Sequence, residues 1–309
     1  LVQGVDYELK TNISTEIRNT SGQASKGTLA NLVVLKTERA VTVTGASKNN
    51  YGLQVAAGVH ASITLNGVTI AAPVPFDIVT NINGTANGQP AERGYEILPE
   101  KRTSVHLTLA DGSTNTLAVT PVSTNRPAIR CGEGSVLVID DSVWNQTAAG
   151  EAITPEQGRV PYDCTLKNGT ELKQGDPLWK MDSQNPGKLA TQGGYYSSSI
   201  GSGQAENSGS ITIDGGELIV RATEPTEQLS LVSFGAGIGG GVGGGAGCTL
   251  EGGGVTINGG HITAYGSYHG AGIGGGYRNG CTLFVSKPMD GAIKARWGKC
   301  ESCSAGTAP

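Results

Sequence analysis

The sequence predicts an all-β fold, a solenoid whose short strands stack as the coils of a parallel β-helix. Glycine supplies 49 of the 309 residues, about twice its usual share. The heptapeptide Gly-Ala-Gly-Ile-Gly-Gly-Gly occurs at residues 235–241 and again at 270–276, and a degraded copy begins at Ser197. Apolar and polar residues alternate between these copies, which is the period of a half-buried strand. Because solenoid coils pack only on their neighbours, such a chain does not have to divide into two globular domains.

Segments with strand-like alternation predict the successive coils. Within residues 210–222, Ile211 and Ile213 fall on one face of a strand, and Val255 and Ile257 do the same within residues 254–266. Both units continue into Asp/Asn-Gly-Gly, residues that tolerate the positive φ of a sharp corner. In the heptapeptide, we expect the single isoleucine to point inward while the glycines let neighbouring coils approach closely.

The units divide the chain into segments. Residues 1–30 are polar and lack the repeat, so we expect a cap over the first coil, which would otherwise expose strand edges. Coils follow over residues 31–285, with insertions at about 81–102 and 145–196, and residues 286–309 form a cysteine-containing tail. The alternative is a β-sandwich, for which Asn66-Gly67 would be a hairpin turn between two short strands.

Composition excludes several functions. The net charge is −4, so no basic surplus favours nucleic-acid binding. No apolar run is long enough to cross a bilayer. The glycine-rich runs lack the lysine of a phosphate-binding loop and the strand–helix context of a dinucleotide site. His261 and His269 have no further ligand at metal-binding spacing, so the sequence predicts neither metal nor cofactor.

The repeats also carry a resemblance. The two heptapeptides, the two Thr-Ile-Asp/Asn-Gly-Gly units and the segments that start at Ile63 and Val105 resemble right-handed parallel β-helix repeat proteins of bacterial cell surfaces, in the pectate-lyase-like superfamily. The resemblance covers about four fifths of the chain, from Leu32 to Val285. It implies a right-handed, single-stranded solenoid and a surface location, and it assigns no activity.

Adjacent carboxylates, Asp140 and Asp141, are the weak catalytic candidates. Glycoside cleavage needs two carboxylates that flank one bond. Neighbouring residues of a strand face opposite sides, so one of the two would have to act with a carboxylate of the insertion. The alternative is an ordinary solvated corner. Asp214 and Asn258 occupy equivalent turn positions, where such side chains usually bond their own backbone.

Scarce aromatic residues mark the expected ligand-binding region, because aromatic faces stack on sugar rings. The candidates are Trp144, Trp179, Tyr265, Tyr268, His269 and Tyr277. The alternative is an ordinary half-exposed ladder of side chains.

Six cysteines and a low charge favour a secreted or cell-surface protein. Cys248 and Cys281 lie nearly one repeat apart, so we expect them to bridge neighbouring coils, while Cys300 and Cys303 clamp the tail. Glycosylation sequons occur at Asn12, Asn19, Asn83, Asn145 and Asn168.

Three functions remain open. The first is a non-catalytic scaffold that binds polysaccharide or glycoprotein glycans, and it is the one we favour. The second is a glycoside hydrolase or a polysaccharide lyase, the latter drawing its basic residue from Arg126, Arg130 or the tail lysines. The third is a self-associating subunit of an extracellular filament or surface layer.

Overall fold

A computed structural model gives the fold over most of the chain. It describes residues 1–15, 28–79, 102–121, 125–141, 146–151, 153–154, 156, 159–166, 169–176, 185–204, 206–223, 234–242, 254–267, 269–276, 283–285 and 293–296. Every regular element within these ranges is a β-strand. No helix in the described part of the chain is long and apolar enough to cross a membrane. The prediction of an all-β protein is therefore confirmed.

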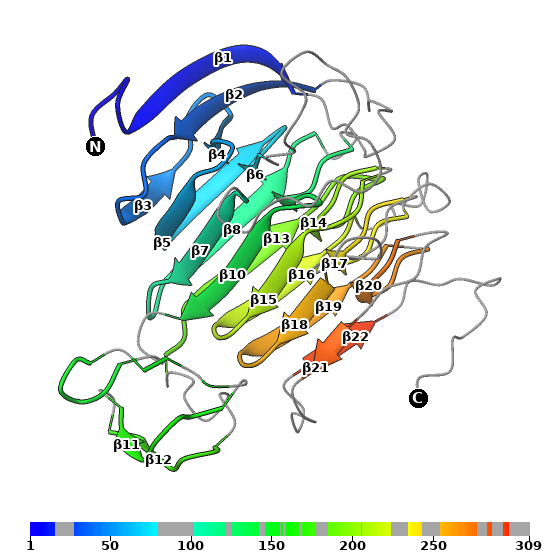
Figure 1. Ribbon diagram of the computed structural model, residues 1–309. Coiled ribbons are helices and arrows are strands. Elements are labelled where there is room, and N and C mark those ends of the chain that lie inside the picture. Colours follow the sequence, from blue (N-terminus) through cyan, green and yellow to red (C-terminus); the bar gives the residue numbers. More distant parts are fainter. Residues whose placement is uncertain are drawn as a thin grey trace.

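The strands form a first sheet and a larger second sheet (Figure 1). The first sheet contains, in order, β1 (Tyr7–Thr15), β2 (Thr28–Leu35), β4 (Tyr51–Val55), β6 (Phe76–Ile78), β9 (Ile129–Cys131), β14 (Ile200–Gly201), β17 (Ile238–Gly239) and β20 (Ile273–Gly274). The second sheet has two branches that meet at β5 (His60–Ala72), beside which lies β3 (Val41–Ala46).

The two branches continue from opposite ends of β5. The β7 branch contains β7 (Ser104–Leu109), β10 (Val136–Asp141), β15 (Ser210–Ile213), β18 (Gly254–Ile257) and β21 (Leu283–Val285). The β8 branch contains β8 (Thr114–Val119), β13 (Lys188–Gln192), β16 (Glu217–Arg221), β19 (His261–Tyr265) and β22 (Ile293–Arg296). Along the chain, the first sheet, the β7 branch and the β8 branch are visited in turn, and each strand pairs in parallel with its equivalent one round later.

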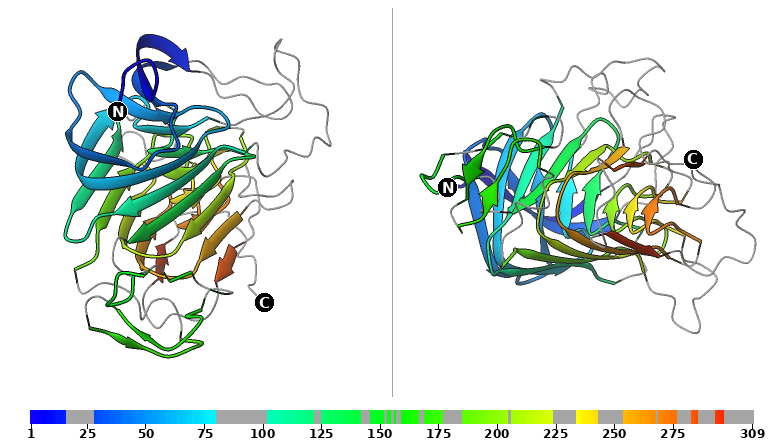
Figure 2. Two further views of the ribbon diagram at one scale, coloured as in Figure 1. Left: turned by 60° about the vertical axis from the view of Figure 1, so that its left-hand side comes forward. Right: turned by 90° about the horizontal axis from the view of Figure 1, so that it is seen from below.

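The main hydrophobic core of the described residues lies inside this curled parallel sheet, whose curvature is seen in Figure 2. The inward-facing residues of both branches and of the first sheet all contribute to it, as in Ile78, Leu107 and Leu189. Ile211, Ile213, Val255 and Ile257 are fully buried, which confirms the faces predicted from alternation. Each such side chain removed from water stabilises the fold by about 1.5–3 kcal/mol.

The glycines of the repeated heptapeptide lie where successive rounds of the chain touch. A Cβ on Gly235 would collide with the carbonyl oxygen of Ser197 in the preceding round, and one on Gly270 would collide with the carbonyl of Gly235. Ile238, between such glycines, is buried in the core. The expected inward isoleucine and close backbone approach are thus both found.

The first strands cover one end of the stack. β1 pairs antiparallel with β2, and β2 pairs in parallel with β4 from Asn31 onward, so the parallel sheet starts after residues 1–30. The interpretation of Asn66-Gly67 as a hairpin turn is wrong, because both residues lie inside the single strand β5. Gly67 instead takes a φ of +70° beside the register shift between β3 and β5.

The insertion after β10 carries a small core of its own. β11 (Cys164–Thr165) pairs antiparallel with β12 (Glu171–Leu172), and the buried side chains there are Ile153, Val160, Leu166 and Leu172. In Figure 1 this segment lies beyond the lower end of the β7 branch. β13 lies within residues 145–196 yet pairs with β8 and β16, so the regular sheet resumes before that range ends.

Candidate functional site

The outer surface of the β7 branch, called here the β7 face, is lined with polar side chains. Alternate residues of each strand point outward because successive side chains take opposite sides. Two rows of outward positions matter here. Parallel pairing puts Ser62 of β5, His106 of β7 and Val138 of β10 in one row. Thr108 and Asp140 share the next row, and Asp214 and Asn258 directly follow the paired residues Ile213 and Ile257.

His106 and Asp140 form the centre of this face. The His106 Nε2 lies 3.0 Å from Asp140 Oδ2. The histidine side chain is 48% exposed, whereas the aspartate side chain is 3% exposed. The backbone amide of Asp141 donates a hydrogen bond of 2.6 Å to Asp140 Oδ1, so both carboxylate oxygens are engaged. The pair therefore presents an imidazole to solvent with a carboxylate held behind it.

The pKa values of both groups are raised, that of Asp140 by burial and that of His106 by the hydrogen bond between the two. Burial raises the pKa of Asp140 to about 6, against the opposing effect of the hydrogen bond from His106. The hydrogen bond with Asp140 raises the pKa of His106 despite its partial burial. Burial also raises the pKa of Asp214, and the hydrogen bond from Asn258 opposes this rise. Groups whose pKa values are perturbed by burial and by a specific partner gather at functional sites.

Asp214 and Asn258 extend the Asp140 row along the stack. The Asn258 Nδ2 donates a 2.8 Å hydrogen bond to Asp214 Oδ1. The two turn positions predicted to be equivalent are thus direct neighbours, and their side chains hydrogen-bond between adjacent rounds of the chain. Asp141 faces the opposite side, where it is fully buried and its Oδ1 accepts a bond of 3.3 Å from the Gly187 amide. Asp140 and Asp141 therefore do not form a carboxylate pair.

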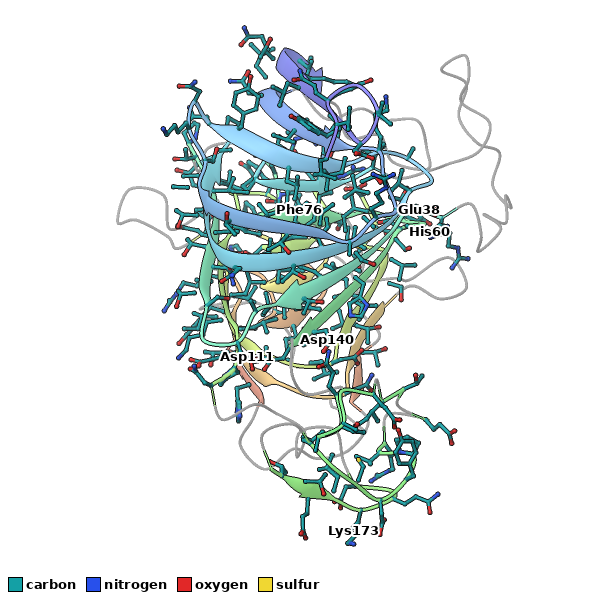
Figure 3. The ribbon with its side chains drawn as sticks, turned by 90° about the vertical axis from the view of Figure 1, so that its left-hand side faces the viewer. Glu38, His60, Phe76, Asp111, Asp140 and Lys173 are labelled. Carbon is teal, nitrogen blue, oxygen red and sulfur yellow. The ribbon has the colours of Figure 1, made fainter. Side chains whose placement is uncertain are left out.

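Figure 3 shows Asp140 on the part of the sheet nearest the insertion, whose far end carries Lys173. Because Asp140 is almost completely covered, it has little access to a glycosidic oxygen, and the group that meets solvent is His106. Glycoside cleavage requires both carboxylates to reach the sugar. The geometry of this face therefore fits proton transfer through the imidazole better than a pair of carboxylates.

A second feature is a ladder of three stacked rings at the corner between the β8 branch and the first sheet. The rings of Tyr196 and Phe234 have centroids 5.6 Å apart, and those of Phe234 and His269 lie 5.0 Å apart. All three residues directly precede a copy of the heptapeptide. One face of the His269 ring is covered by Phe234, so this residue takes part in a ladder of rings.

Tyr265 lies on the outer surface of the β8 branch, called here the β8 face. The Arg221 guanidinium sits over its ring, 4.3 Å from the centroid. The two residues are paired in register on neighbouring strands, and Gln192 follows them on the next strand. Further along the same strands, Lys188 and Glu217 form an ion pair of 2.7 Å. This face combines an aromatic ring with hydrogen-bonding and charged groups.

The arginines considered for a lyase are buried. The Arg130 guanidinium donates a hydrogen bond of 2.9 Å to Asp77 and two hydrogen bonds to the carboxylate of Glu206. Its side chain is 10% exposed, and Arg126 is buried as well. Arg130 ties β6 and β9 of the first sheet to the segment that follows β14, and two carboxylates already neutralise it.

Several predicted residues lie outside the described part of the chain. They are Trp144, Trp179, Tyr268, Tyr277, Cys248, Cys281, Cys300, Cys303, Asn19, Asn83, Asn145 and Asn168. The predicted pairing of those cysteines stays a prediction. Of the sequons, Asn12 is described and is exposed on β1. The two described cysteines, Cys131 and Cys164, are free thiols.

Sequence reasoning missed Ser62, His106 and Phe234. Phe234 could have been found by comparing the residue before each heptapeptide, whereas His106 lies in a round that lacks the motif. Among the described residues, no group of three His, Cys, Asp or Glu side chains is arranged to hold a metal ion. Comparison with family models, with curated proteins and with solved structures finds no match to this chain.

Proposed function

We propose that this protein is a secreted or cell-surface scaffold, built as a single right-handed parallel β-helix, that binds glycan polymers. The helical course is supported by the order in which the chain visits the first sheet, the β7 branch and the β8 branch, and by the parallel pairing between rounds. The right hand is supported by the strong preference of parallel crossovers for that hand.

The β8 face is the proposed glycan-binding surface. The observation that carries the proposal is the Arg221–Tyr265 pair, in which the guanidinium lies over one face of the ring on the outer side of a regular sheet. Aromatic rings stack on the apolar faces of sugars, while flanking polar groups bond the hydroxyls. Gln192 on one side and the Lys188–Glu217 pair further along supply such groups. Regular strand spacing suits a polymer because equivalent positions recur with each round.

Affinity electrophoresis against a panel of soluble polysaccharides tests the proposal. We expect at least one polymer to retard the protein, and Tyr265→Ala to weaken that interaction about tenfold, the effect of about 1.4 kcal/mol. Tyr162→Ala is the matched control, since Tyr162 is 45% exposed on the insertion. Retardation by no polymer, or an equal loss in both variants, would contradict the proposed surface.

A further inference from the structure

We propose that Ser62, His106 and Asp140 form a hydrolytic triad on the β7 face that cleaves carboxylic esters. The three residues come from adjacent strands β5, β7 and β10. Ser62 supplies the nucleophile, His106 the base, and Asp140 the carboxylate that orients the base. Such a triad is recognised by geometry and roles on any scaffold, whatever the order of its residues along the chain.

Strand register brings the nucleophile to the base. Ser62 and His106 are direct Cα partners on β5 and β7. Two residues earlier, the same strands hold the reversed pair, His60 opposite Ser104. There the His60 Nδ1 lies 2.7 Å from Ser104 Oγ. That pair demonstrates that directly opposed serine and histidine side chains on this face can meet through Nδ1.

The contact with Asp140 uses one ring nitrogen of His106 and leaves the other, Nδ1, for Ser62. Asp140 occupies Nε2 at 3.0 Å, so Nδ1 is the nitrogen that remains for the serine hydroxyl. Ser62 is exposed and His106 is half-exposed, so a substrate can reach both. Asp140 lies behind them, and the Asp214 carboxylate also favours a positive charge on His106. Both carboxylates therefore stabilise the imidazolium that forms when the base accepts a proton.

The reaction balances with an ester and water. Ser62 Oγ bonds to the ester carbonyl carbon while its proton passes to His106 Nδ1. The ester C–O bond then breaks, and the leaving oxygen takes that proton and departs as an alcohol. Water adds to the acyl-serine, again through His106, and releases a carboxylic acid and the free Ser62 hydroxyl.

The face is open around the proposed nucleophile. Val138 is the Cα partner of His106 on the side away from Ser62, so it lies two strand spacings from the serine. An outer sheet surface admits an alcohol of any size, including one carried on a polymer. This inference does not depend on glycan binding by the β8 face.

Labelling with a fluorophosphonate probe tests the triad, because the probe phosphonylates activated serines. We expect one label per folded chain, located on Ser62 by peptide mass spectrometry. Ser62→Ala should abolish the label, and His106→Gln should slow labelling about 100-fold or more. Ser210→Ala, a serine on β15 of the same branch, is the matched control and should label as the wild type does. The labelling rate should rise with pH as His106 loses its proton.

Three results would overturn the proposal: no label on Ser62 in the folded wild type, a label on Ser104 in its place, or a rate that His106→Gln leaves unchanged. Because Ser62 is exposed, its alanine variant is expected to fold, and circular dichroism checks this for every variant. Hydrolysis of a nitrophenyl acetate ester by wild type and not by Ser62→Ala is the corresponding turnover measurement, and equal turnover by both would also overturn the triad.

Discussion

Replacing Asp140 with asparagine should change how the stability of the protein depends on pH. An aspartate in an unfolded chain has a pKa of about 3.9, whereas burial raises that of Asp140 to about 6. Between these values the folded state binds a proton that the unfolded state does not. The free energy of unfolding therefore decreases as pH rises through this window. The difference of roughly two pH units corresponds to about 3 kcal/mol.

His106 changes stability in the same direction. Its pKa is raised mainly by the hydrogen bond with Asp140, so its contribution is present below about pH 6.5 and is lost as pH rises through the folded-state value. Asparagine does not ionise and removes most of the cause of the shift on His106. We therefore expect Asp140→Asn to gain about 3 kcal/mol relative to wild type between pH 4 and pH 8.

Urea unfolding of both proteins at a series of pH values from 4 to 8 measures this difference. Asp163→Asn is the control, because Asp163 is exposed on the insertion and the Gln174 amide and Lys173 lower its pKa. Its contribution is present above about pH 4 and is lost as pH falls, so the sign of its pH dependence is opposite. A wild-type-to-variant difference for Asp140 that stays constant across the series would refute the reasoning.

Four further outcomes are expected from the fold. Gly235→Ala should lower the free energy of unfolding in urea by about 3 kcal/mol or more, because the added Cβ would collide with the backbone carbonyl of Ser197. Ser197→Ala, at the equivalent position, should cost about 1 kcal/mol. Equal losses in the two variants would contradict the contact. Arg130→Met leaves two buried carboxylates without their guanidinium and should cost about 3–5 kcal/mol in the same assay. Phe234→Leu removes both ring contacts and should cost about 1–3 kcal/mol, read as a lowered thermal midpoint. Burial raises the pKa of the Cys131 thiol to about 12, so Ellman's reagent should leave it unmodified until the protein unfolds.

The local alternation of apolar and polar residues was sufficient to predict which face of each strand is buried. Alternation depends only on neighbouring residues, so Ile211 and Val255 could be assigned to the core without knowing which strands pair. The glycines were equally informative, because the heptapeptide occurs twice and implies contact between its copies. The hairpin at Asn66-Gly67 failed because Asn-Gly also suits a bulge within a strand, and only the pairing of β5 distinguishes the two.

The candidate site depends on long-range register, which no local pattern contains. Ser62 and His106 lie 44 residues apart, and His106 and Asp140 lie 34 apart. They lie on adjacent strands only because the chain makes one complete round between them. These rounds lack the glycine heptapeptide, so their lengths could not be counted from the sequence. The ring ladder was within reach, since Tyr196, Phe234 and His269 hold the same place before each motif copy.

The glycine contacts are the same between successive rounds of the chain, so one round could be removed or repeated without changing them. Gly270 meets the carbonyl of Gly235 much as Gly235 meets that of Ser197. A chain from which residues 235–269 were removed would place Gly270 against Ser197, and Phe234 would still precede an intact heptapeptide. A duplicated unit would likewise find matching surfaces on both sides. The length of the stack can therefore change in whole rounds of the chain, because each added or removed round brings its own glycine contacts with it.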